Sequence, residues 1–186
     1  MTRKVVFALA ALLALVVTAA SEAAWAPRTH SFGGSCSLQG TTYFNPPVTN
    51  TEAKQRWHFE GRGSCTGTVD GRSLADTPIV AHIGGGLRSS CLAAESNHSF
   101  GWARFTMGTA RRNDDAMIRF SFQGRGTLTE IDFTLRGRRG GSAHGHATFL
   151  TTRTPPDTAL RCSGTGVDKV PTDVSVQTDS PLVSGG

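Results

Sequence analysis

The chain lacks the short motifs that mark several large enzyme classes. Its 186 residues contain no G-x-S-x-G nucleophile elbow, no H-E-x-x-H zinc motif and no phosphate-binding G-x-x-x-x-G-K. No two of its cysteines lie close together in sequence, as the ligands of a structural zinc ion usually do. These absences favour a protein that is not an enzyme and that carries no cofactor.

Long apolar runs are confined to the N-terminus. Residues 1–4 are basic, residues 5–17 are almost wholly apolar, and small residues dominate 18–26, which is the pattern of a secretory signal peptide. We expect residues 1–26 to be the signal peptide, with cleavage within 20–26. An N-terminal anchor is the alternative, but the apolar run is short for a transmembrane helix. No second run is long enough to cross a membrane, so we expect a secreted, extracellular chain with no transmembrane segment after cleavage.

Helical periodicity is also missing after the signal peptide, and period-two alternation takes its place. The alternation is clearest in residues 115–151, where three alternating runs are joined by two turns rich in glycine and arginine. This pattern predicts a three-stranded antiparallel meander. Similar runs recur along the chain at a spacing of roughly ten residues, which predicts about nine or ten short strands. The expected fold class is therefore all-β, a single-domain antiparallel β-sandwich or flattened β-barrel with meander connections and two disulfides.

Glycine and proline indicate where these strands end. Residues 45–47 (Asn-Pro-Pro), 61–63 (Gly-Arg-Gly) and 84–86 (Gly-Gly-Gly) are expected to terminate strands, and Asp70-Gly71 is a hairpin turn signal. Residues 159–164 are expected to form a strand that carries a cysteine.

The β-domain is expected to span residues 35–178. Residues 27–34 are interpreted as a flexible lead-in, and residues 179–186 as a disordered tail.

The four cysteines are Cys36, Cys65, Cys91 and Cys162. An even number in an exported chain predicts two disulfides, for which three pairings exist. We favour Cys36–Cys65 with Cys91–Cys162, because each first partner then lies in the same half of a meander. The loop-entropy relation predicts that these bonds stabilise the fold by roughly 3.5 and 4.5 kcal/mol.

Histidines supply the candidate metal ligands. His144 and His146 lie two apart on one face of an extended run and could provide two ligands. His82 and His58 also point away from the predicted core, so these side chains would converge if their strands were neighbours. The simpler interpretation, which we prefer, is that they are solvated positions on an outer face and that no metal is bound.

Basic side chains gather in a predicted turn at Arg136, Arg138 and Arg139. They are candidates for binding an anion, although solvated turn charge is the preferred interpretation. Arg125 is expected at the opposite end of the meander, so its charge would not add to theirs. The net charge is +5, and removing Arg3, Lys4 and Glu22 with the signal peptide leaves 17 basic and 13 acidic residues, or +4. This charge favours weak attraction to anionic polymers, without the clustered basic face that nucleic-acid binding requires.

One pair of carboxylates suggests the hypothesis that the protein is a hydrolase. Glu130 and Asp132 lie two apart on one strand and therefore on one face. A glycosidase uses two carboxylates, although they usually come from separate strands. Ordinary solvated charge is the preferred interpretation.

Three segments carry a resemblance to a known group. They are SCSLQGTTYFNPPVT (35–49), GSCTGTVDG (63–71) and GGSAHGHATF (140–149), which is followed by a late cysteine. In these segments the chain resembles small uncharacterised secreted β-rich proteins of actinomycetes, and the resemblance covers most of residues 35–165. It implies export and a disulfide-bonded β-fold, and it brings no activity or site residue.

The function expected from the sequence is a non-catalytic binding or envelope-interaction module, acting on an unknown ligand such as an anionic envelope polymer or a small molecule. Nucleic acid is not an expected partner. A small extracellular hydrolase that uses carboxylates or histidines from separate strands is one alternative. A lipocalin-like carrier of an apolar small molecule is another, which needs an internal cavity and which the small inward residues Ala143, Gly145 and Ala147 would permit.

Overall fold

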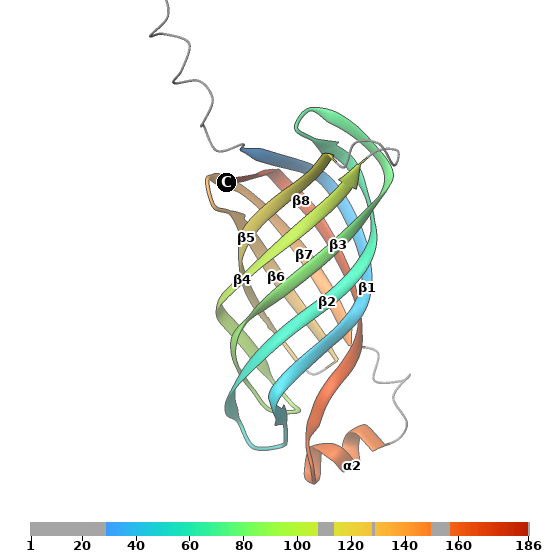
Figure 1. The fold of residues 1–186 in the computed structure, drawn as a ribbon. Coiled ribbons are helices and arrows are strands. Elements are labelled where there is room, and N and C mark those ends of the chain that lie inside the picture. The colour runs from blue at the N-terminus through green and yellow to red at the C-terminus, as the bar shows by residue number, and fades with distance from the viewer. Residues whose placement is uncertain (1–28, 108–113, 128, 150–156, 186) are drawn as a thin grey trace, which may run out of the picture.

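The computed structural model describes the chain except residues 1–28, 108–113, 128, 150–156 and 186, and it shows a closed β-barrel (Figure 1). The strands are β1 (His30–Val48), β2 (Ala53–Val69), β3 (Arg72–Ser89), β4 (Ala94–Met107), β5 (Asp114–Gly126), β6 (Glu130–Gly137), β7 (Gly140–Phe149) and β8 (Val167–Ser184). A short helix, α2 (Asp157–Ser163), precedes β8. In the described part of the chain, no helix has the length and apolarity to span a membrane.

Every strand pairs antiparallel with its neighbours in sequence, and β1 also pairs with β8 to close the ring. Within the described residues, closure pairs the two outermost strands of the sheet along most of their length. The predicted antiparallel all-β fold is confirmed, and of the two architectures considered the chain adopts the barrel. The meander expected in residues 115–151 is also confirmed, because it corresponds to β5, β6 and β7.

The predicted limits of the domain were wrong at both ends. Residues 30–34 of the expected lead-in lie in β1, and residues 179–184 of the expected tail lie in β8. The two segments pair with each other, as in the register of Phe32 with Leu182. Local sequence could not show this pairing, because it joins the two ends of the domain. The predicted signal peptide falls outside the described residues.

The strands are also fewer and longer than predicted. The glycines of 61–63 and 84–86 lie within β2 and β3, and residues 45–47 lie within β1, where its pairing with β8 is interrupted between Tyr43 and Val48. Residues 159–163 belong to the helix α2 rather than to a strand. A helix of seven residues is too short to display a 3.6-residue period.

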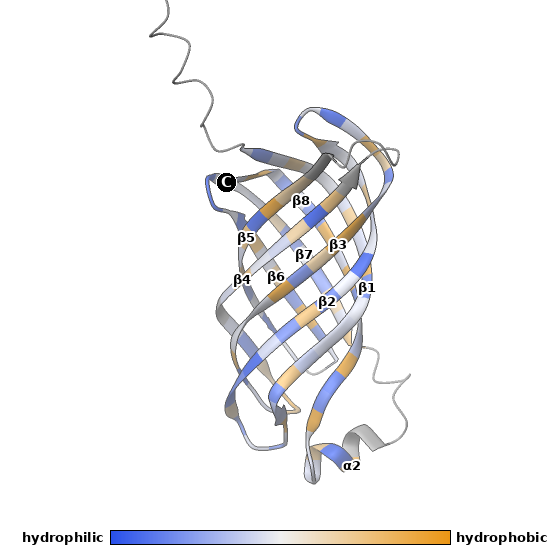
Figure 2. Ribbon diagram, in the orientation of Figure 1, coloured by the Kyte–Doolittle hydropathy of each residue, from blue (hydrophilic) through white to orange (hydrophobic). Residues whose placement is uncertain are grey.

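The glycines inside the strands make room for phenylalanine rings in the barrel. A Cβ atom on Gly101 would lie 2.5 Å from Cε2 of Phe120, and one on Gly145 would lie 2.5 Å from Cε2 of Phe133. All described phenylalanines except Phe100 are buried, namely Phe32, Phe44, Phe59, Phe105, Phe120, Phe122, Phe133 and Phe149. An eight-stranded barrel encloses just enough space for side chains, so these rings fill it. Figure 2 shows the resulting alternation of apolar and polar residues along the strands.

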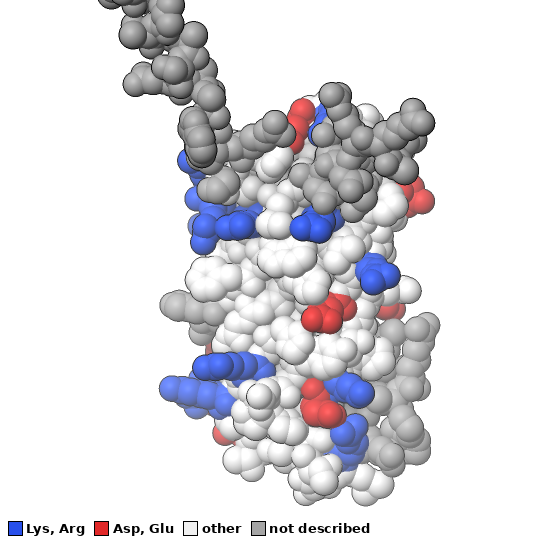
Figure 3. All heavy atoms as spheres, in the orientation of Figure 1, with Lys and Arg blue, Asp and Glu red and all other residues white. Residues whose placement is uncertain are grey.

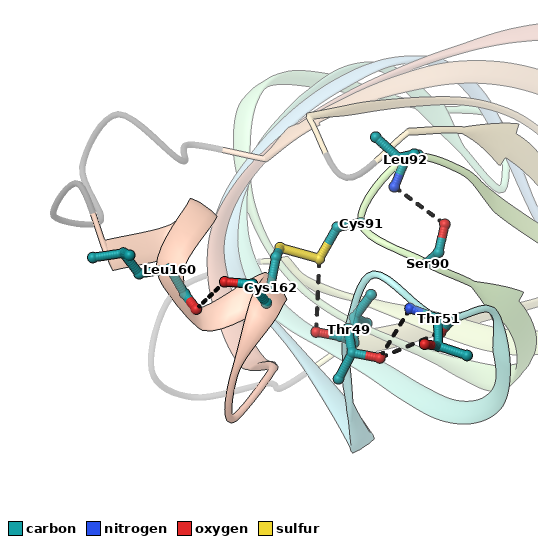
Figure 4. The surroundings of a disulfide bond; sticks show 9 residues. Thr49, Thr51, Ser90, Cys91, Leu92, Leu160 and Cys162 are labelled. Atoms are coloured by element: carbon teal, nitrogen blue, oxygen red, sulfur yellow. Dashed lines mark hydrogen bonds between the residues drawn. A yellow bond between two sulfur atoms is a disulfide. The ribbon is translucent and has the colours of Figure 1, made fainter.

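Both disulfides have the favoured pairing. Cys36–Cys65 joins directly opposed residues of β1 and β2, and Cys91–Cys162 joins the loop after β3 to α2. Figure 4 shows the surroundings of the second disulfide. Near this disulfide, the amide of Asn50 donates to the carbonyl of Cys162 over 2.9 Å. The α2 end of the barrel is therefore held by a covalent link as well as by hydrogen bonds. Two disulfides also indicate folding in an oxidising compartment.

The hairpin turn at Asp70-Gly71 is confirmed, with φ angles of 51° and 75° that suit a type I′ turn. The Asp70 carboxylate accepts hydrogen bonds from the Ser31 amide over 2.8 Å and from His30 Nδ1, 2.7 Å away. Burial of this carboxyl favours its neutral form, but the bonds from His30 and Ser31 outweigh burial and lower the pKa of Asp70 below its ordinary value of 3.8. The turn thus holds the start of β1.

We predict that Gly145→Ala destabilises the barrel by about 3 kcal/mol, because its new methyl group would overlap the Phe133 ring and the Ser175 carbonyl. Gly86→Ala is the matched control, since a Cβ there meets nothing within 4 Å. The control should change stability by about 0.5 kcal/mol or less. Urea unfolding followed by tryptophan fluorescence measures both, and equal midpoints for the two variants would refute the role given to Gly145.

We also predict that Asp70→Asn flattens the acid limb of the stability profile. A carboxyl with a lowered folded pKa contributes stability above the unfolded pKa of about 3.9, and this contribution is lost as pH falls through the folded pKa. The variant lacks this titration, so its melting temperature should fall less than that of the wild type below about pH 4. Asp76→Asn, an exposed change in β3, is the control. Parallel curves for Asp70→Asn and the wild type would contradict the assignment.

Candidate functional site

The barrel interior has little free space. Two separate cavities of about 40 Å³ each lie between the packed aromatic rings. Polar side chains beside the cavity nearer α2 bond to one another, as Thr42 does to Thr172 over 2.8 Å. Sites for drug-sized ligands occupy roughly 300–1,000 Å³. The small residues Ala143, Gly145 and Ala147 therefore serve close packing, and the interior does not supply the cavity that a lipocalin-like carrier needs.

The outer wall carries an unusual group of aromatic side chains. Tyr43 on β1 and Phe100 and Trp102 on β4 point outward, whereas every other Phe or Trp of the described strands points into the barrel. The rings of Tyr43 and His58 stack with centroids 4.6 Å apart, and those of His82 and Trp102 with centroids 4.5 Å apart. Neither stack follows from the spacing of residues along one strand, so sequence analysis missed both.

The register of β1 to β4 makes these side chains one surface. Tyr43 lies opposite His58, which lies opposite Gly84, and Gly84 lies opposite Phe100. Directly opposed residues of antiparallel strands point to the same face. We call the set formed by Tyr43, His58, His82, Phe100 and Trp102 the aromatic platform. Phe100 is 67% exposed. Figure 3 shows this side of the barrel, where uncharged surface occupies much of the middle and most Lys and Arg lie toward the two ends.

Two adjoining hollows continue from the platform around the outer wall. The first, of about 180 Å³, lies between Phe100 and Arg136. The second, of about 540 Å³, reaches Asp132 and His144, and both hollows are lined by Gln123 and Thr134. We call the two hollows together the outer groove, which runs across β4, β5, β6 and β7.

Glu130 and Asp132, the two carboxylates of the hydrolase hypothesis, both lie near His146 on the outer wall. His146 Nδ1 lies 2.8 Å from Asp132 Oδ1, and its Nε2 lies 3.9 Å from Glu130 Oε2. The neighbouring His144 Nδ1 lies 2.6 Å from Oδ1 of Asp179. Asp179 was missed in the sequence because it was placed in a disordered tail, and no local signal marks it as a partner of β7.

The candidate metal ligands are divided between two walls. His144 and His146 lie on β7, whereas His82 lies on β3, four strands away in a ring of eight. Their outward side chains therefore cannot converge on one ion. His58 and His82 occupy adjoining strands but belong to separate ring stacks. Within the described residues, no three His, Cys, Asp or Glu side chains are grouped as a metal site requires.

The candidate arginines Arg136, Arg138 and Arg139 lie near one end of the meander, and Arg125 lies near the other end. Arg136 is in β6, and Arg138 and Arg139 form the turn to β7, where Arg139 Nη1 lies 3.3 Å from the Thr29 hydroxyl. Arg125 lies near the opposite end of β5 and donates to Glu95 over 2.9 Å. That hydrogen bond, together with the attraction between the two charges, raises the pKa of Arg125 above its ordinary value.

Comparisons with known proteins add no assignment. The sequence matches no family model, no curated protein and no solved structure.

Proposed function

We propose that the protein is an exported, non-catalytic binding module that attaches to a polymer outside the cell through its aromatic platform. Export is supported by the signal-peptide pattern and by the two disulfides. The observation that carries the proposal is the gathering of all outward aromatic side chains of the described strands on β1 and β4, within one four-strand surface.

Exposed aromatic rings suit a polymer with flat apolar faces, such as a chain of sugar rings. A ring that remains in water forgoes the stabilisation it would gain by burial, so a cluster of such rings marks an interaction surface. The closed barrel holds these rings on a rigid wall. Because little conformational entropy is lost on binding to a rigid surface, even a shallow platform can bind usefully.

The platform leads to a test by substitution. We predict that the double variant Phe100→Ala/Trp102→Ala loses about tenfold or more of its binding to insoluble cell-wall polysaccharide, because two outward rings of the platform are removed. Its melting temperature should stay close to that of the wild type, since Phe100 is exposed and Trp102, which is partly buried against His82, also lies outside the core clusters. The measurement is depletion of purified protein by washed peptidoglycan sacculi and by chitin.

Leu160→Ala is the matched control, because Leu160 is 71% exposed but lies on α2, away from the platform. It should bind as the wild type does. Equal depletion of the wild type and the double variant on both polymers would rule out the platform as the binding surface.

A hydrolase is a second candidate, favoured by the positions of Glu130, Asp132 and His146 beside the larger hollow of the outer groove. The carboxylates are 64% and 88% exposed, so they remain solvated and lack the water-excluding surroundings that strengthen acid–base catalysis.

We predict that Glu130→Gln/Asp132→Asn has the same activity as the wild type on a panel of nitrophenyl glycosides and esters, namely none above buffer. Turnover by the wild type that falls at least a hundredfold in the double variant would instead establish the hydrolase.

A further inference from the structure

We propose that the polymer bound by the platform is an acidic glycan, a chain of sugar rings that bear carboxylate or phosphate groups, and that Arg119 and Arg136 bind those groups. This proposal rests on the function proposed above and names the ligand class of the same surface. Of these two arginines, the sequence pattern indicated only Arg136 as a candidate for binding an anion.

The strand register places these arginines directly beside the exposed rings. Trp102 lies opposite Arg119, and Phe100 lies opposite Ser121, which in turn lies opposite Arg136. Neighbouring strands are about 4.8 Å apart, so Arg136 emerges about 10 Å from Phe100. Two adjacent rows across β4, β5 and β6 therefore each combine an aromatic ring with a guanidinium group.

The first hollow of the outer groove has the dimensions and lining for a sugar. It lies between Phe100 and Arg136, and Ser121, Gln123 and Thr134 line it between them. Its volume of about 180 Å³ is well below that of a site for a drug-sized molecule and suits one sugar ring. Hydroxyl and amide groups both donate and accept hydrogen bonds, as the vicinal hydroxyls of a sugar require.

Arg119 and Arg136 give this wall two positive charges next to the rings. Among the described residues, the one carboxylate beside the platform, Glu60, lies 3.8 Å from His82. Arg88, Arg125 and Arg161 each pair with a carboxylate, whereas neither Arg119 nor Arg136 forms an ion pair with another described residue. A guanidinium group binds a carboxylate or phosphate through two parallel N–H groups. The net charge of +4 expected after removal of the signal peptide adds attraction for a polyanion at a distance.

A glycan explains the surface better than a single-stranded nucleic acid does. Bases stack one after another on rings arranged along a basic channel. Here Phe100 and Trp102 lie side by side on one strand, and the hollow next to Phe100 is lined mainly by hydroxyl and amide groups, together with Phe122.

The test compares two polymers that differ only in charge. Polygalacturonate carries a carboxylate on each sugar, and its methyl ester has the same backbone without that charge. We predict that the intact secreted protein binds polygalacturonate about tenfold more tightly than the ester at low ionic strength. The difference should shrink in 0.5 M salt, because exposed charges are then screened. Affinity electrophoresis measures both polymers, with oligo(dT) as a third probe.

Single substitutions assign the charge preference to residues. Arg119→Gln and Arg136→Gln should each weaken binding of polygalacturonate about fivefold and leave binding of the ester unchanged. Arg88→Gln removes an exposed arginine of β3 outside the site and should have no effect. Phe100→Ala/Trp102→Ala should weaken binding of both polymers.

Any of the following results would overturn the proposal: equal affinity of the wild type for the two polymers, binding of oligo(dT) more tightly than polygalacturonate, or arginine variants that behave like Arg88→Gln. Binding of neither polymer would also overturn it. In each case the proposed binding function survives if the double aromatic variant still loses its attachment to sacculi or chitin. If that variant binds everything as the wild type does, both proposals fail.

Discussion

Closure of the barrel by the pairing of β1 with β8 is the constraint on which the other features depend. It satisfies the backbone groups that the two ends of the sheet would otherwise expose. It also encloses an interior so narrow that a ring such as Phe133 fits only because a residue in its path, Gly145, has no side chain. Gly61, which looks like an interruption in the sequence, likewise makes room for the Phe59 ring, and β2 continues through it.

Because the interior of the barrel is filled, the candidate binding surfaces lie on its outer wall. The two internal cavities of about 40 Å³ leave no room for a ligand of ordinary size, whereas the outer wall holds hollows of about 180 and 540 Å³. The barrel acts as a rigid support, and the disulfide between Cys91 and Cys162 fixes the α2 end. Side chains on such a wall keep their relative positions, so rings and charges brought together by the register can act as one surface.

Several features were predictable because they depend on residues near one another in sequence. Alternation in residues 115–151 predicted the three strands β5–β7, and Asp70-Gly71 predicted a hairpin turn. The choice of Cys36–Cys65 was also correct, although sequence alone could not show that these residues face each other across a strand pair. Predictions failed at the chain ends and at α2, where the structure depends on distant partners or on too few residues to show a period.

Some features of the candidate site were likewise predictable from local sequence, whereas others depended on the pairing of strands. Glu130 and Asp132 share a face of one strand by periodicity alone, and the arginines of the β6–β7 turn follow from composition. The link between Trp102 and Arg119, or between Phe100 and Arg136, required the register of three strands. The amino-acid sequence by itself determined a disulfide-bonded β-domain, because alternation, turn residues and cysteine count are local properties. Only the tertiary structure decided that the sheet closes, that its interior is filled and that Arg119 and Arg136 lie on strands next to the outward rings, because hydrogen bonding between strands sets which distant residues become neighbours.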